Sequence, residues 1–86
     1  MAKIENQFIH MDDDTLAATL KEYEEWCDTA FVPEGGPLAK ARDKYCDAYD
    51  AHGLLIMQKE LLYAGSKRWL EIKEKRNENK ERNHTY

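Results

Sequence analysis

One short segment of the chain cannot be helical, and it divides the sequence into two parts. Residues 32–37 read Val-Pro-Glu-Gly-Gly-Pro, so two prolines and two glycines fall within six positions. Proline removes a backbone donor and glycine favours turn geometry, so a helix must end here. Pro37 is well placed as the first residue of a following helix, where its missing N–H is not needed. Because the connection is short, we predict an antiparallel helical hairpin.

The helix before this turn begins at a capping signal. Asp12 has the side chain of a helix cap, and Met11 and Leu16 fall at the positions of a hydrophobic staple. Apolar side chains then recur at the spacing of one helical face: Leu16, Leu20, Tyr23, Cys27 and Ala30 or Phe31. Trp26 lies on the flank of this face, where its ring can seal the edge of the core or anchor a partner. We predict a helix over residues 12–31.

The part after the turn changes character at Gly53. From Leu38 an apolar stripe of ordinary width predicts a half-buried helix. Beyond Gly53, apolar side chains point in nearly every direction around a helix: Leu54, Leu55, Ile56, Met57, Leu61, Leu62 and Tyr63. A helix that is apolar all round must be covered all round. Gly65 with Ser66 can either end this helix or bend it, and we favour a bent continuation.

The predicted fold is therefore all-α, a single small domain over residues 1–86. It is an antiparallel hairpin with a long second helix that Gly65 can kink, and the predicted helices cover residues 12–31, 37–64 and 66–80. Residues 1–11 lack a sustained period and are interpreted as an N-terminal arm that docks on a neighbour. Residues 77–86 are almost wholly polar and are predicted to be a frayed tail.

Length and cysteine content limit the ways in which this domain can be stabilised. A chain of 86 residues buries only about 60 to 65% of its unfolded surface, so it has little core to spare. Cys27 and Cys46 are predicted to be free, because the sequence has no secretory signal and a reducing compartment is then expected. No apolar run approaches the length of a membrane span. We predict a cytoplasmic protein that does not enter membranes.

The polar clusters favour caps and solvated faces over chemistry. His10 with Asp12–Asp14 lacks the spacing of a calcium loop. His52 with Cys46 lacks the spacing of a zinc site, and a core position is expected for His52. Glu22 and the other acidic side chains of the helices have no cleft to desolvate them, so they are interpreted as solvated faces. We predict no catalytic residue, no metal and no cofactor.

The segment 54–63 has more apolar surface than a two-helix hairpin can bury. Each of Leu54, Met57 and Leu61 would forgo about 1.5 to 3 kcal/mol if it stayed exposed, a large share of the stability of so small a domain. Three alternatives could cover this apolar surface: residues 69–72 folding back, the same patch on a second copy, or a different protein. The residue types that interfaces favour give the predicted protein interface: Leu54, Met57, Leu61, Tyr63, Trp69 and Trp26.

Charge is distributed unevenly along the chain. Residues 1–52 carry 12 acidic and 5 basic side chains, whereas residues 53–86 carry 5 acidic and 8 basic ones. The basic end could contact a nucleic-acid backbone through Lys67, Arg68, Lys73 and Arg76, although interspersed glutamates weaken this field. The acidic outer face of the first helix could instead imitate a phosphate backbone and block a nucleic-acid-binding enzyme.

We expect a non-enzymatic interaction protein that self-associates, binds another protein, or does both. Small chains with surplus apolar surface are often regulators or inhibitors, including those encoded by phages and other mobile elements, which is an analogy of size and composition. The expected mechanism is steric, with an apolar helix face docking on the partner. Nucleic-acid binding and nucleic-acid mimicry are the alternatives.

Overall fold

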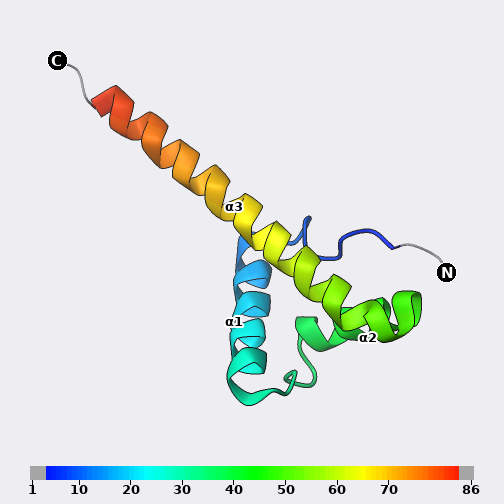
Figure 1. Cartoon of the computed structure of the whole chain (residues 1–86). Helices are drawn as coiled ribbons and strands as arrows, with labels where there is room; N and C mark the ends of the chain where they lie inside the picture. Colours follow the sequence, from blue (N-terminus) through cyan, green and yellow to red (C-terminus); the bar gives the residue numbers. More distant parts are fainter. Residues whose placement is uncertain (1–3, 84–86) are drawn as a thin grey trace.

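The chain is all-α, which confirms the predicted fold class (Figure 1). A computed structural model describes residues 4–83, and side chains over residues 4–76. Within these residues there is no strand, and the elements follow in the order α1 (Asp13–Thr29), α2 (Pro37–Tyr49), the short 3-10 helix η1 (Asp50–His52) and α3 (Gly53–Asn83). In Figure 1, α1 and α2 lie against one half of α3, and the other half projects beyond them.

The first helix begins where the capping signal predicts. Asp12 occupies the N-cap position in an extended conformation, and Met11 packs against the core beside it. The helix ends at Thr29, two residues before the predicted end, because Ala30 has a left-handed backbone with φ of +68°.

The turn after α1 is held in place by α1 itself. Glu22 accepts a hydrogen bond from the backbone N–H of Leu38 at 3.1 Å, which satisfies one of the free donors at the start of α2. The Glu22 carboxylate occupies the space that a Cβ at Gly36 would need, so a larger residue there would displace this carboxylate. The solvated face predicted for Glu22 is wrong, because this side chain is half-buried and fixes the hairpin.

The hairpin is confirmed, but the long second helix is interrupted at residues 50–52 and not at Gly65. Asp50 has φ of +52°, and the chain then reverses so that α3 packs back on α2. A Cβ at Gly53 would lie 2.7 Å from backbone atoms of Cys46, so only glycine allows this close reversal. The predicted helix boundaries at residues 64 and 66 are therefore wrong, whereas the favoured continuation of the helix through Gly65 is confirmed. His52 is exposed at the reversal and is not a core residue.

The core of the domain is closed by the N-terminal arm. Phe8 is completely buried and stacks on Tyr45, with ring centroids 5.9 Å apart. The hydroxyl of Tyr45 accepts the backbone N–H of Gln7 at 3.0 Å, and the hydroxyl of Tyr49 accepts that of Ile4 at the same distance. The arm therefore docks on its own chain and helps to cover the apolar segment 54–63. This cover was not among the three alternatives considered from the sequence.

The far end of α3 extends beyond the predicted helix. Its backbone is helical to Asn83, so the predicted polar tail over residues 77–86 begins inside α3. Residues 84–86 of that tail and residues 1–3 of the predicted arm lie outside the described residues. Among the residues described, no helix is both long and apolar enough to cross a membrane.

Candidate functional site

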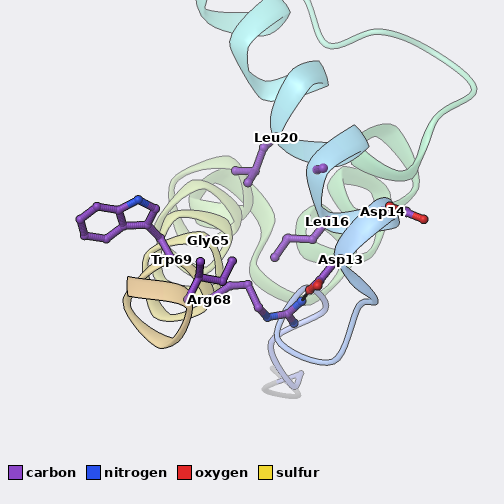
Figure 2. A pocket seen from close by; sticks show the side chains of 9 residues that line it. Asp13, Asp14, Leu16, Leu20, Gly65, Arg68 and Trp69 are labelled. Carbon is purple, nitrogen blue, oxygen red and sulfur yellow. Dashed lines mark hydrogen bonds and ion pairs between the residues drawn. The ribbon is translucent and has the colours of Figure 1, made fainter. Parts of the chain in front are cut away.

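Two adjoining hollows between α1 and α3 form one concave surface. Their volumes are about 390 and 400 Å³, and both are lined by Leu20, Gly65 and Trp69. We call them together the α1–α3 groove. Its lining is mostly apolar, with Leu16, Ala17, Leu62, Leu70 and Ile72 among the further residues. Figure 2 shows Leu20 reaching from α1 toward α3, and the Trp69 ring projecting outward from α3.

The groove arises because α1 crosses α3 steeply and is in close contact with it over only part of its length (Figure 1). Arg68 forms an ion pair with Asp13 near the start of α1. Ten residues earlier on α3, the side-chain amide of Gln58 donates to the hydroxyl of Tyr23 at 3.1 Å. Between these two contacts, a Cβ on Gly65 would lie 3.4 Å from the Leu20 side chain. The missing side chain at Gly65 therefore leaves space in the floor of the groove.

The contact with the start of α1 divides α3 into two halves. Residues 53–68 are the packed half, which contacts the rest of the domain. Residues 69–83 are the projecting half, and every side chain described there, from Trp69 to Arg76, is exposed. Trp69 is 58% exposed, and the ammonium group of Lys73 lies 5.0 Å from the centre of its ring. A large aromatic side chain is therefore left in solvent beside an apolar groove.

The predicted protein-interface residues separate into two groups. Met57 and Leu61 are completely buried in the chain's own core, so the prediction that they are surface anchors is corrected. Phe8 and the side chains of α1 and α2 cover them, and a partner cannot reach them in this fold. The remaining predicted residues are Leu54, Tyr63 and Trp69, which are exposed, and Trp26, which is half-buried with its ring edge-on to Tyr23.

The predicted nucleic-acid contacts do not form one surface. Lys67 lines a separate hollow of about 220 Å³ beside His10. Arg68 pairs with Asp13 and donates to the carbonyl of Met11 at 2.9 Å, so it ties α3 to the start of α1. Lys73 lies over the ring of Trp69, and Arg76 is exposed further along α3. Arg68 therefore has a structural role that the charge pattern did not indicate.

Titratable groups with shifted pKa values are found in the core and in a surface ion pair. The hydroxyl of Tyr45 donates to a Glu60 carboxylate oxygen at 2.7 Å, and burial raises the pKa of Tyr45 well above its ordinary value. Arg42 makes two hydrogen bonds to the carboxylate of Glu34, at 2.8 and 3.1 Å, and lowers the pKa of that carboxyl group. Both thiols are free. In the part of the chain that the structure describes, no three His, Cys, Asp or Glu side chains are grouped so as to hold a metal.

Two features of the site were missed from the sequence. Thr19 is completely buried in α1 because its hydroxyl donates to the carbonyl of Thr15 at 2.7 Å, which satisfies the polar group locally. Gly65 was interpreted as a possible kink, whereas it allows α1 and α3 to approach. The acceptor is a backbone carbonyl that any residue at position 15 would supply, so no sequence signal marked the first feature. No protein-family model, curated protein or solved structure matches this chain.

Proposed function

We propose that this is a non-enzymatic interaction protein that binds a helix of another protein chain in the α1–α3 groove. The observation that carries the proposal is an exposed apolar groove beside a core that is already complete. Phe8, Met57 and Leu61 have no exposed surface, so the core is closed without Leu62, Trp69, Leu70 and Ile72 of the groove. Leu62, Trp69 and Ile72 nevertheless remain 41, 58 and 45% exposed.

The groove has the features of a helix-binding site. An amphipathic helix binds by placing apolar residues, three or four positions apart, into a groove between other helices. Trp69 is the residue type that most often contributes a large share of binding energy at interfaces. Asp13 and Asp14 border one end of the groove, where Asp13 is already paired with Arg68 of α3.

The proposed mechanism is steric. A helix held against α1 and α3 is no longer free to contact its other partners, so the protein regulates or inhibits by occupying that helix. This mode of action needs no catalytic group, cofactor or metal. We place it in the cytoplasm, because free thiols at Cys27 and Cys46 suit a reducing compartment.

Site-specific photo-crosslinking tests this proposal. A photoreactive phenylalanine analogue replaces Leu70 at the groove, and in a control protein it replaces Asp47, which is exposed on α2. Protein adducts are expected from position 70 and not from position 47, and changing Trp69→Ala is expected to reduce them. Equal adducts from both positions, or none from position 70, would contradict the proposal.

A further inference from the structure

The outer side of α3 carries a second apolar seam with a period of seven residues. Leu55, Leu62 and Trp69 are seven residues apart, and Gly65 and Ile72 repeat the same interval three residues later. We call these five residues the outer seam. Apolar residues at alternating spacings of three and four are typical of a helix that pairs lengthwise with another helix.

The inner face of α3 shows what such a seam does when it has a partner. Met57, Leu61, Ala64 and Arg68 also alternate in steps of four and three, and they face the rest of the domain. The outer seam has no such cover except at Gly65, where Leu20 lies close. It also continues from the packed half onto the projecting half, so its length exceeds what α1 can cover.

The distribution of charge on α1 and α3 indicates which helix pairs with the outer seam and in which direction that helix runs. Residues 67–76 of α3 carry five basic and two acidic side chains, whereas residues 20–28 of α1 carry four acidic and one basic. Within this acidic part of α1, the hydroxyl of Tyr23 accepts a hydrogen bond from the side-chain amide of Gln58, near the start of α3, at 3.1 Å. A second α3 running antiparallel along the seam brings its basic end to this acidic part, whereas a parallel arrangement brings two basic ends together.

Side-chain size agrees with the antiparallel arrangement. If Leu62 of one copy faces Trp69 of the other, the two Gly65 positions meet at the centre and leave room for both indole rings. In this register Lys73 of one copy faces Gln58 of the other. Tyr23 contacts Gln58, so the next exposed acids on that side of α1, Glu24 and Asp28, come within reach of Lys73 and Arg76.

We propose that the partner helix is α3 of a second copy, and that the protein forms an antiparallel twofold dimer along the outer seam. The proposal rests on the proposed function and names the occupant of the α1–α3 groove. The same patch is used on both copies, as twofold symmetry requires, and each copy contributes α1 and α3 to a four-helix arrangement. Pairing along the outer seam covers its apolar side chains, which a single chain leaves exposed to solvent.

Charge reversal tests the proposed pairing in solution. Light scattering after size exclusion is expected to show a dimer, and K73E/R76E is expected to weaken association about tenfold or more. E24K/D28K is expected to do the same, because each variant places like charges at both ends of the seam. Mixing the two variants restores opposite charges at both ends, so a heterodimer is expected. The control variant K40E/K67E has the same charge change as K73E/R76E, but at exposed positions off the seam. It is expected to remain a dimer.

Disulfide trapping tests the direction. In a background without native cysteines, Q58C and K73C are expected to crosslink to each other when mixed, and neither to itself. Crosslinking of Q58C to Q58C alone would overturn the antiparallel arrangement. The dimer proposal would be overturned if the wild-type protein were a monomer at high concentration. It would also be overturned if the charge-reversal variants associated as strongly as the wild type. If the protein were a monomer and its position 70 crosslinked to a different protein, the proposed function would stand and only the dimer proposal would be refuted.

Discussion

The two halves of α3 differ both in composition and in surroundings. The packed half, residues 53–68, contains Met57 and Leu61 with no exposed surface, while the projecting half leaves Trp69 and Leu70 more than half exposed. The packed half is apolar around most of its circumference, whereas the apolar side chains of the projecting half are confined to Trp69, Leu70 and Ile72. The arm, α1 and α2 pack against the first half and bury part of its apolar surface.

This comparison separates stability from binding. Residues of the inner face of α3, Met57, Leu61 and Ala64, should control the free energy of unfolding, and residues of the outer seam should control association. Stability measurements on dilute monomer can therefore test this distinction, because the two faces predict opposite results for neighbouring positions.

The largest effect is expected at the arm that closes the packed half. Phe8→Ala should lower the free energy of unfolding by about 3 to 5 kcal/mol, because it removes a completely buried ring. Phe31 is 77% exposed and provides the matched control, with an expected change for Phe31→Ala within about 0.5 kcal/mol. Urea unfolding followed by circular dichroism measures both. Similar small losses would mean that the arm is not part of the core.

Adjacent leucines on α3 provide the next comparison. Leu61→Ala should destabilise the monomer by about 2 to 5 kcal/mol, because it leaves a cavity beside Met57. Leu62→Ala should cost the monomer less than about 1 kcal/mol, and it should weaken association instead. Chemical unfolding and light scattering on the same two variants are needed. If Leu62→Ala unfolds the domain as readily as Leu61→Ala, the distinction between inner and outer faces fails.

The two glycines of α3 should respond with opposite sign. Gly53→Ala should destabilise by about 1 to 3 kcal/mol, because the new methyl group meets the backbone of Cys46. Gly65→Ala should stabilise the monomer by about 0.5 to 1 kcal/mol, because alanine is the better helix former and Leu20 allows contact at 3.4 Å. Thermal unfolding of the two variants decides the sign. A loss of stability in G65A would show that α1 and α3 are packed more tightly than this.

The smallest effect concerns pH. Burial raises the pKa of Tyr45 above its ordinary value of 10.0, so the folded state keeps this proton at a pH where the unfolded state loses it. This contribution to stability is present below pH 10 and is lost above it, by up to about 1.4 kcal/mol per pH unit. Tyr45→Phe should reduce this slope, whereas Tyr63→Phe, at a 58% exposed position, should keep it. Equal slopes would contradict the assignment to Tyr45.

Local signals in the sequence predicted the elements well and their packing poorly. The cap at Asp12 and the turn at residues 32–37 depend on neighbouring residues, so the start of α1 and the hairpin were predictable. The break before Gly53 depends on how closely α3 approaches Cys46, which is a tertiary contact. The burial of Met57 required knowing that Phe8, far away in sequence, lies over it. The groove could not be predicted for the same reason, because the sequence does not show that Gly65 lies beside Leu20.

The docking of the arm also sets an order of events in synthesis. The N–H of Ile4 pairs with a hydroxyl 45 positions later, and the side chain of Asn6 with a carbonyl 54 positions later, at Glu60. Contacts this distant in sequence close late, because the intervening chain must first be brought together. On the ribosome, residues 4–8 emerge before α3 and have no binding surface until the start of α3 has followed. The arm is therefore made before the helices that it docks on but folds after them, and the apolar side chains of α3 beneath it stay uncovered until it does.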